Sequence, residues 1–318
     1  NGPCRFGQYR KLQRIIFDRL GYTQVKIVSP SNTNAYVELS GGKPFTFRLR
    51  AWTGVVAADM LRRMVGETRP YETVPGEAER VYRDSLARLI RRIEGGEGRL
   101  APIVREAAEA FKGIPKQKIA RKPVVVIVGE IFMRDNAFCN GRVVERLESM
   151  GAETVTAPFF EWLAYSAYRY RRDSRWKGEL GGRVRAALLA AIQSVTARPI
   201  INAAVGGLDA RLDVDLDDML DSCGPYVHRH YDGDPPLALG AAAALADAGV
   251  SGVVNILPFT CQPGTLIMAV SSMLRQDKKN IPWVDIAYDG QDDAAIDTRL
   301  QAFTHQVYDY AELVRQES

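Results

Sequence analysis

The residue best placed to take part in chemistry is Cys261, which follows an apolar run. Residues 252–257 are largely β-branched and apolar on both faces, which predicts an interior strand of a covered parallel sheet. Pro258 ends this strand and Pro263 opens an apolar helix, so Cys261 should lie in a strand-to-helix turn. Ligands bind in such turns, outside the carboxyl ends of parallel strands. The alternative is a structural role, because free cysteines are among the most buried residues.

Cys4 occupies a similar place near the start of the chain. It lies in a Gly- and Pro-containing turn, before apolar residues at helical spacing: Leu12, Ile15, Ile16 and Leu20. Helix N-termini favour anions, including thiolates. Because residues 24–28 then predict a strand, residues 1–29 should be the last two thirds of a β-α-β unit whose first strand lies upstream. The chain begins with Asn, so we expect a fragment or a processed subunit.

A second strand-turn-helix segment carries polar residues in its turn. Residues 122–128 are the strongest predicted strand, and residues 143–150 follow as a helix. Glu130, Arg134 and Asn136 lie between them, where polar side chains can contact a ligand, although exposed loop charges are the commoner explanation. Since both turns should follow parallel strands at one sheet edge, we expect these three residues to line the same cleft as Cys261.

Cys223 precedes two histidines in a short segment that ends at His230. Two His and one Cys within eight residues suggest zinc, but the Cys-x-x-Cys spacing of structural zinc sites is absent. The segment 169–177 carries five basic residues among aromatics, which is compatible with nucleic-acid stacking or with a solvated helix end. The net charge is only +4, from 42 basic and 38 acidic residues, so we predict no nucleic-acid partner.

The remaining pattern predicts the elements that position these residues. Three amphipathic helices should form a layer ahead of a Lys-rich linker that begins near Pro115, over residues 51–65, 78–93 and 101–111. After the linker, strands alternate with helices, with strands at 122–128, 152–157, 252–257 and 281–288. This alternation predicts an α/β fold with doubly wound, mainly parallel sheets in two Rossmann-like domains with a helical layer. At 318 residues we expect an N-terminal α/β-helical domain over 1–121 and a C-terminal α/β domain over 122–318.

Several classes of protein are excluded by missing patterns. The sequence has no Gly-x-Gly-x-x-Gly after a strand, no phosphate-binding loop and no Gly-x-Ser-x-Gly. No run approaches the ~18 uninterrupted apolar residues of a membrane span, and no signal peptide opens the chain. We therefore predict a cytoplasmic protein without a membrane partner. Four scattered cysteines favour metal binding or burial over disulfides.

Five motifs occur in an order that resembles a known family. They are Gly2-Pro-Cys-Arg-Phe-Gly-Gln-Tyr9, Arg69-Pro-Tyr-Glu72, Gly129-Glu-Ile-Phe-Met-Arg134 with residues 136–140, Pro258-Phe-Thr-Cys-Gln-Pro-Gly264 and Tyr288-Asp-Gly-Gln291. Over nearly the whole chain they resemble the acyl-CoA dehydratase activase-related proteins. These are relatives of the D-component of 2-hydroxyacyl-CoA dehydratases, of benzoyl-CoA reductase subunits and of double-cubane cluster proteins.

The resemblance implies an oxygen-sensitive iron-sulfur protein with a cluster of the 4Fe-4S or double-cubane type. An ATP-hydrolysing activase or another electron donor would supply low-potential electrons for a reductive or dehydration reaction, with acyl-CoA as a possible substrate. Carried over by position, Cys4 and Cys261 match the cluster cysteines and Cys223 is the predicted third ligand. Cys139 stands where a small, non-ligating residue is expected.

Two further expectations accompany this reading. The aromatic segment 159–170 and the incomplete first unit predict an oligomer or a chain completed by a partner. The rival hypothesis is a cluster-free α/β module that recognises acyl-CoA or an activase partner, and a brown colour after anaerobic purification would separate the two.

Overall fold

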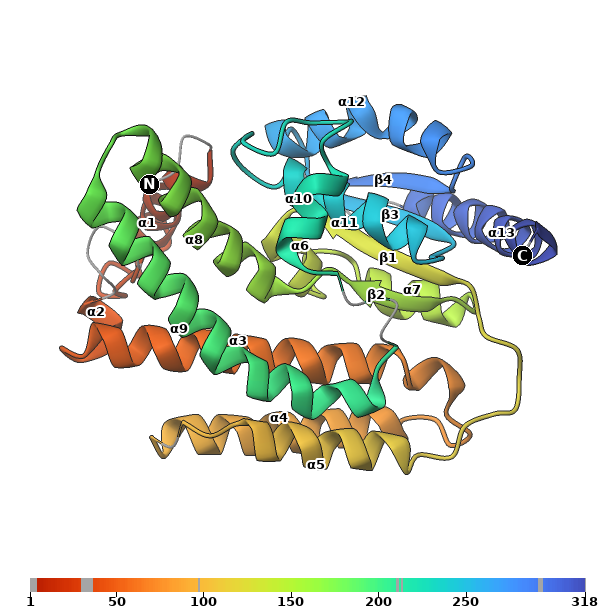
Figure 1. Ribbon diagram of the computed structural model, residues 1–318, viewed down its shortest axis with the longest axis horizontal. Coiled ribbons are helices and arrows are strands. Elements are labelled where there is room, and N and C mark those ends of the chain that lie inside the picture. The colour runs from red at the N-terminus through yellow and green to blue at the C-terminus, as the bar shows by residue number, and fades with distance from the viewer. Residues whose placement is uncertain are drawn as a thin grey trace. The chain divides into compact units, whose positions relative to one another are not determined.

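The chain divides into two compact units, Asn1–Trp52 and Thr53–Ser318. The computed structural model (Figure 1) describes residues 5–29, 37–96, 98–209, 212, 214–290 and 294–317. The described part of the first unit holds a short 3-10 turn and mainly helices: η1 (Arg5–Gln8), α1 (Tyr9–Arg19), α2 (Val37–Ser40) and the start of α3 (Pro44–Gly66). The predicted helix after Cys4 is confirmed, while Cys4 itself lies outside the described residues.

The strand predicted over residues 24–28 is wrong. These residues form a turn followed by irregular backbone, and the side chain of Arg14 donates hydrogen bonds to the carbonyl oxygens of Tyr22 (2.8 Å) and Val25 (2.6 Å). A strand requires a neighbour to pair its backbone, and no strand pairs with this segment within the described residues. The β-α-β interpretation of residues 1–29 therefore fails.

All four described strands belong to one parallel sheet in the second unit, in the order β2-β1-β3-β4. They are β1 (Val124–Gly129), β2 (Glu153–Thr156), β3 (Gly252–Pro258) and β4 (Trp283–Tyr288). β1 and β3 are buried almost throughout, as expected of parallel strands covered on both faces. The predicted α/β class and parallel sheet are confirmed, but the described residues form one sheet and not the two expected of two Rossmann-like domains.

Helices cover both faces of this sheet (Figure 1). On one face, Val125 and Ile127 pack in a layer with residues of α7 (Val143–Ser149) and α13 (Ala294–Glu317). On the other face, Val126 and Val253 pack with residues of α11 (Pro235–Asp247) and α12 (Gln262–Asp277). The period-2 alternation of β1 sends successive valines to opposite layers, so one apolar run builds two cores.

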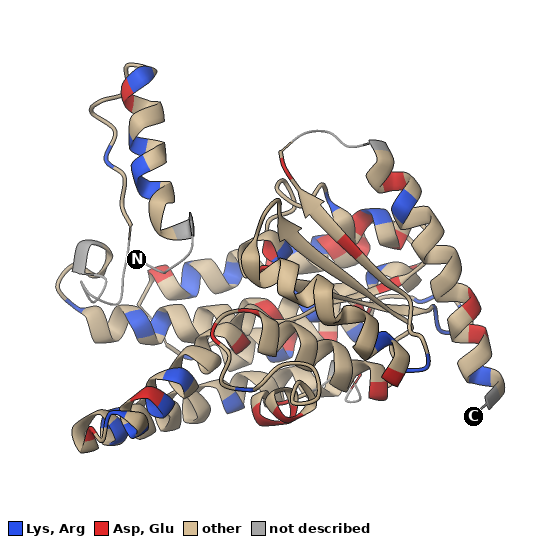
Figure 2. Ribbon diagram, turned by 90° about the horizontal axis from the view of Figure 1, so that it is seen from above, with Lys and Arg blue, Asp and Glu red and all other residues tan. Residues whose placement is uncertain are grey.

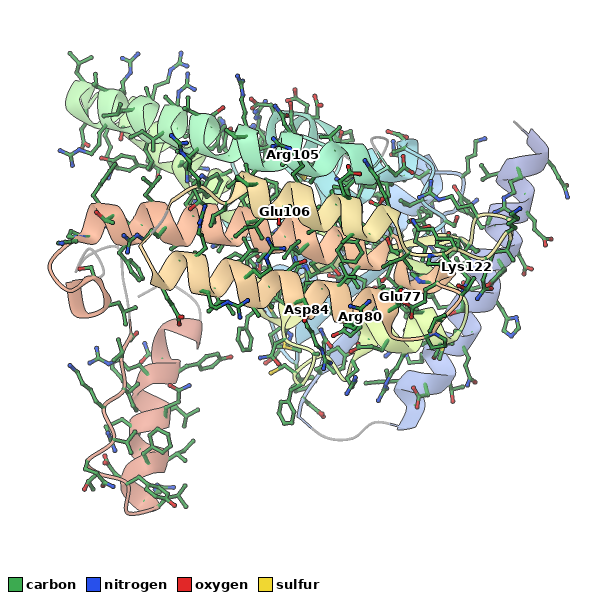
Figure 3. All side chains as sticks on the ribbon, turned by 90° about the horizontal axis from the view of Figure 1, so that it is seen from below. Glu77, Arg80, Asp84, Arg105, Glu106 and Lys122 are labelled. Carbon is green, nitrogen blue, oxygen red and sulfur yellow. The ribbon has the colours of Figure 1, made fainter. Side chains whose placement is uncertain are left out.

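The predicted helical layer is confirmed in α3, α4 (Glu77–Glu94) and α5 (Ala101–Lys112), which all precede β1. The domain boundary at residues 121 and 122 stays a prediction. Figure 3 shows Glu77, Arg80 and Asp84 along α4, where Arg80 forms exposed ion pairs of 3.8 and 3.9 Å with the two acids. Exposed pairs of this kind add little stability, typically 0 to about 1 kcal/mol each. Acidic and basic residues are interspersed along the helices (Figure 2).

An exposed apolar helix face lies outside the predicted aromatic segment. The predicted aromatic surface lies on α8 (Phe159–Trp176), but Tyr165 is fully buried there. The apolar residues of α9 (Leu180–Ala204) are exposed instead, at Leu180, Val184, Leu188 and Val195. By length and composition alone, α9 is also the single helix in the described part of the chain that could cross a membrane.

The Arg69-Pro-Tyr-Glu72 motif joins the helical layer to the sheet. Arg69 donates two hydrogen bonds to Glu148 of α7, at 2.6 and 3.0 Å. The hydroxyl of Tyr71 donates to buried Glu153 of β2 (2.6 Å) and accepts from the backbone N–H of Lys122 (3.0 Å). The carboxylate of Glu72 accepts from backbone N–H groups at the start of α4. The motif therefore has a structural explanation in this fold.

We expect Tyr71→Phe to lower the free energy of unfolding by about 1 to 3 kcal/mol, because buried Glu153 loses a hydrogen bond. Tyr308→Phe is the matched control, since it removes a 2.9 Å bond to the carbonyl of Gly151 at an exposed site and should cost less than about 1 kcal/mol. Urea denaturation measures both. Equal losses in the two variants would contradict the role assigned to Tyr71.

Candidate functional site

The strand order reverses between β1 and β3, and the candidate site lies at the carboxyl ends of these two strands. The chain passes from β1 to β2 on one side and later returns to place β3 on the other side of β1. Open α/β sheets bind ligands outside the carboxyl ends of the strands at such a reversal. The backbone N–H of Glu130 donates to the carbonyl oxygen of Ile256 (2.9 Å), so both turns leave the same edge. The predicted shared edge for Glu130 and Cys261 is confirmed.

Gly129 lets β1 and β3 approach each other closely at this edge. Its φ is +108°, a conformation that residues with a side chain rarely adopt. A Cβ atom at this position would lie 2.7 Å from Oδ1 of Asn255 and 2.8 Å from the backbone nitrogen of Ile256, and would overlap the carbonyl oxygen of Ile256. Only glycine fits where the strand ends and the turn begins.

Cys261 lies at the N-cap of α12, as the sequence predicts. Its backbone is extended, and its carbonyl oxygen accepts from the N–H of Thr265 (2.8 Å), which starts the helix. The preceding residue, Thr260, has φ +63°, which is a strained conformation for a β-branched side chain. Strain of this kind is concentrated at functional sites, because the surrounding structure has to compensate for it.

Two of the three polar residues predicted after β1 have local structural roles. The carboxylate of Glu130 accepts from the N–H of Met133 (2.8 Å) and thereby caps α6 (Ile131–Asp135). Oδ1 of Asn136 accepts from the N–H of Cys139 (3.0 Å) and shapes the following turn. Neither contact requires a ligand.

Arg134 differs, because the Nε atom of its guanidinium group is buried without a hydrogen-bond partner. The residue is 6% exposed, and its Nε atom has no hydrogen-bond partner within the described structure. Burial lowers the pKa of Arg134, while the negative charges of Glu161 and Asp234 oppose this effect. A buried guanidinium that forms no hydrogen bond is costly, so its surroundings require an explanation.

Two acidic residues that sequence reasoning missed complete the site around Arg134. Glu161 lies in the first turn of α8 and is 8% exposed. Burial raises its pKa to about 8, and the charge of Arg134 partly opposes the shift. Asp234 is the N-cap of α11 but its side chain makes no capping bond, and burial raises its pKa to about 7 against the charge of Arg134. Asp-Pro-Pro before a helix signals a cap, whereas no sequence pattern reveals the burial.

The neighbouring charges on α3 are already paired. Asp59 accepts from the backbone N–H of Phe160 (2.8 Å) and pairs with Arg62 (2.8 Å), and burial raises its pKa. Arg62 also pairs with Asp135 of α6. Arg134, Glu161 and Asp234 are therefore the groups that remain without side-chain hydrogen bonds in this part of the described chain.

The other cysteines lie in apolar layers. Cys223 is fully buried in the apolar layer that also contains residues of β1, β3 and α11, and its thiol donates to the carbonyl oxygen of Leu220 (3.1 Å). Burial raises the pKa of this thiol to about 11, which favours the protonated form over the thiolate that binds metals. Cys139 packs against the opposite layer, and Cys4 lies outside the described residues. Within the described ranges, no three His, Cys, Asp or Glu residues are grouped to hold a metal ion.

The His-containing and basic segments contact each other. The rings of His228 and His230 lie 4.9 Å apart, and Arg172 donates to the carbonyl oxygen of His230 and to Asp232, both at 2.8 Å. Arg172 also lies over the ring of Trp176, 4.8 Å from its centroid. These contacts hold the end of α8 against the segment that leads to Asp234.

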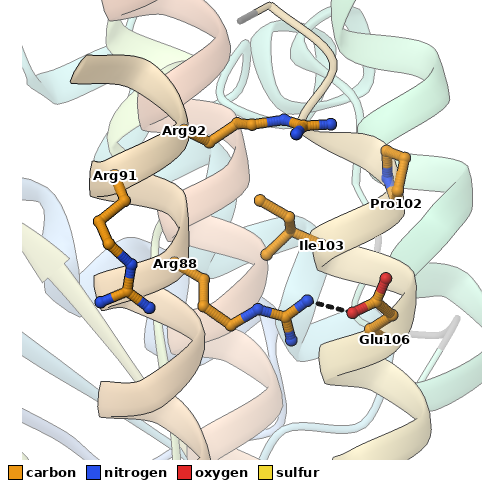
Figure 4. A pocket seen from close by; sticks show the side chains of 6 residues that line it. All are labelled: Arg88, Arg91, Arg92, Pro102, Ile103 and Glu106. Carbon is orange, nitrogen blue, oxygen red and sulfur yellow. Dashed lines mark hydrogen bonds and ion pairs between the residues drawn. The ribbon is translucent and has the colours of Figure 1, made fainter. Parts of the chain in front are cut away.

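A hollow of about 410 Å³ lies elsewhere, between α4 and α5 (Figure 4). Its lining residues are Arg88, Arg91, Arg92, Pro102, Ile103 and Glu106. Arg88 pairs with Glu106 across it, and both side chains are exposed. This basic, open hollow shares no residue with the sheet edge.

Comparison with known proteins finds no family model, no curated protein and no solved structure that matches this chain.

Proposed function

We propose that this chain is an iron-sulfur protein of the 2-hydroxyacyl-CoA dehydratase type, with Cys261 as a cluster ligand. The observation that carries the proposal is the position of Cys261, at the N-cap of a 16-residue helix, beside a strained residue and at the reversal of strand order. A helix N-terminus stabilises a thiolate and a negatively charged cluster. When bound, such a cluster would pass on low-potential electrons received from an ATP-hydrolysing activase, for a reductive or dehydration step on an acyl-CoA.

The described residues fit one ligand of a cluster and do not complete it. Cys261 is half-buried at the sheet edge, whereas Cys139 and Cys223 contribute to apolar layers on opposite faces of the sheet. Iron-sulfur clusters are held by several cysteine thiolates. We therefore propose Cys4, and a partner or a second copy, as the source of the remaining ligands. The exposed apolar residues of α9 support a partner or an oligomer, because such a face is commonly covered by another chain.

Iron and sulfide assays on anaerobically prepared protein test this proposal. We expect brown wild-type protein, and loss of at least half of the iron in Cys261→Ser and in Cys4→Ser, because each substitution removes a thiolate ligand. Cys139→Ser is the matched control and should retain its iron. Iron content that is indifferent to Cys261 and Cys4 but sensitive to Cys139 would reject the ligand assignment.

The Cys223→Ser variant tests whether Cys223 is a cluster ligand or only a residue of the apolar core. The burial of Cys223 predicts a loss of about 1 to 3 kcal/mol in unfolding free energy, because a hydroxyl replaces a thiol in an apolar layer. The iron content per folded molecule should remain unchanged. Loss of iron from folded Cys223→Ser would instead restore Cys223 as the third ligand.

The second candidate is a cluster-free module that binds acyl-CoA or an activase partner. Among the described residues, Cys261 is the one suitably placed cysteine, which favours this candidate, as does the charged group around Arg134 at the ends of α6, α8 and α11. This candidate predicts colourless protein without iron after anaerobic purification. It also predicts that Cys261→Ser binds acetyl-CoA as tightly as the wild-type chain does.

A further inference from the structure

Arg134, Glu161 and Asp234 converge from three different elements beside the sheet edge. They belong to α6, to the first turn of α8 and to the N-cap of α11. Glu161 and Asp234 are the two strongest electrostatic partners of Arg134. Nevertheless Arg134 forms no ion pair with either acid within the described structure, and its Nε atom is sealed from solvent without a partner. The group thus has unused hydrogen-bonding capacity in a buried place.

The surrounding charged residues do not supply the missing hydrogen-bond partner of Arg134. Arg62 is matched by Asp59 and Asp135, and Glu130 is occupied by capping α6. Arg63, which also acts on Glu161, pairs with Glu67 at 2.9 Å. Helices α8 and α11, with 18 and 13 residues, both direct their positive N-terminal ends to their acidic member of the group. A guanidinium whose buried Nε atom lacks a hydrogen-bond partner and two helix N-termini together favour an incoming anion.

We propose that Arg134, Glu161 and Asp234 bind the carboxylate of a small organic acid. The planar guanidinium fork matches a carboxylate in geometry, and a protonated Glu161 or Asp234 can donate its O–H to the same ligand. Both acids must be protonated to accept the negative ligand, so binding takes up protons. Arg134 and Glu161 are only 6% and 8% exposed, which restricts the ligand to a small molecule. This inference requires no cluster and stands apart from the proposed function.

Acetate is the probe, with acetamide as its uncharged isostere, titrated into the full chain by calorimetry at pH 6 and pH 8.5 and at constant ionic strength. We expect the affinity of the wild-type chain for acetate to be at least tenfold weaker at pH 8.5, because each required proton costs about tenfold per pH unit above its pKa. Acetamide should bind at least tenfold more weakly than acetate at pH 6, since it lacks the charge that pairs with Arg134.

Glu161→Gln provides the sharpest test, because glutamine keeps the shape of a protonated glutamate and a hydrogen-bond donor but has no carboxyl group that can ionise. This variant should bind acetate at pH 8.5 about fourfold more tightly than the wild-type chain, because a carboxyl with a pKa of about 8 is mostly ionised at that pH. Glu145→Gln is the matched control on α7, where the carboxylate is exposed and pairs with Arg142, and it should behave as wild type. Arg134→Lys retains the charge but loses the fork, and should weaken acetate binding at least tenfold at pH 6.

Four results would each overturn the proposal. These are absence of acetate binding by the wild-type chain, equal affinity at both pH values, acetamide binding as tight as that of acetate, and a Glu161→Gln variant with the pH dependence of the wild-type chain. If Arg134→Lys fails to fold, the Glu161→Gln comparison still decides. The iron assays on Cys261 are independent of these titrations, so either result can fail without the other.

Discussion

Gly129→Ala is expected to lower the free energy of unfolding by more than about 4 kcal/mol, the largest loss of any substitution considered for this chain. The new Cβ atom would overlap the carbonyl oxygen of Ile256 and lie 2.8 Å from its nitrogen, and these are backbone atoms that cannot rotate away. β1 and β3 would have to separate at the edge where Glu130 and Cys261 leave the sheet. Chemical denaturation measures the loss, and insoluble expression of the variant is the same outcome in its extreme form.

Gly249→Ala is the matched control for this prediction. Gly249 has a similar positive φ of +93°, but no atom lies within 4 Å of the position its Cβ would take. Its substitution therefore measures the backbone cost alone, about 1 to 2 kcal/mol. If Gly129→Ala costs no more than Gly249→Ala, the close approach of β1 and β3 is not what requires glycine at this position.

The second large effect concerns the dependence of stability on pH. The pKa of Glu161 is raised from 4.5 to about 8 by burial, so the folded chain binds a proton that the unfolded chain releases. The resulting stability is fully present below about pH 4.5 and is lost as the pH rises through about 8. We expect Glu161→Gln to be more stable than the wild-type chain at pH 9 by about 2 to 4 kcal/mol, and nearly equal to it at pH 5.

Urea denaturation across this pH range is the measurement. Asp234 contributes a further loss with the same sign, because burial raises its pKa from 3.8 to about 7, and this loss remains in Glu161→Gln. Exposed Glu145→Gln should leave the profile unchanged. A Glu161→Gln variant whose stability runs parallel to that of the wild-type chain would mean that Glu161 is ionised and stabilised in the folded state.

The elements that position the site follow from local sequence patterns. The continuous apolar runs of β1 and β3 predict covered parallel strands, and Pro263 marks a helix start that the structure confirms. Because parallel strands end at a common edge, the neighbourhood of Glu130 and Cys261 also follows from the sequence. Strands and helix starts can be predicted because they depend on the periodicity and the turn-forming residues of a short stretch of sequence.

Other features depend on which surfaces pack together, and the tertiary structure alone decided them. Residues 24–28 have the composition of a strand but lack a strand to pair with in the described chain, so the carbonyl oxygens of Tyr22 and Val25 bond to Arg14 instead. Cys223 follows an acidic segment and precedes two histidines, yet it is fully buried in an apolar layer that contains residues of β1, β3 and α11.

The group around Arg134 shows the same limit most clearly. Its sequence context marks Arg134 as a turn residue and Asp234 as a helix cap, and Glu161 has no distinguishing pattern at all. The burial of Arg134 and Glu161, and the interaction of Arg134 with Asp234, arise only in the folded chain, where residues of α6, α8 and α11 come together. The sequence by itself determined the four strands of the parallel sheet and the position of Cys261 between β3 and α12. Long-range packing decided which charged groups became desolvated in the same part of the fold, because desolvation depends on neighbours that are remote in the chain.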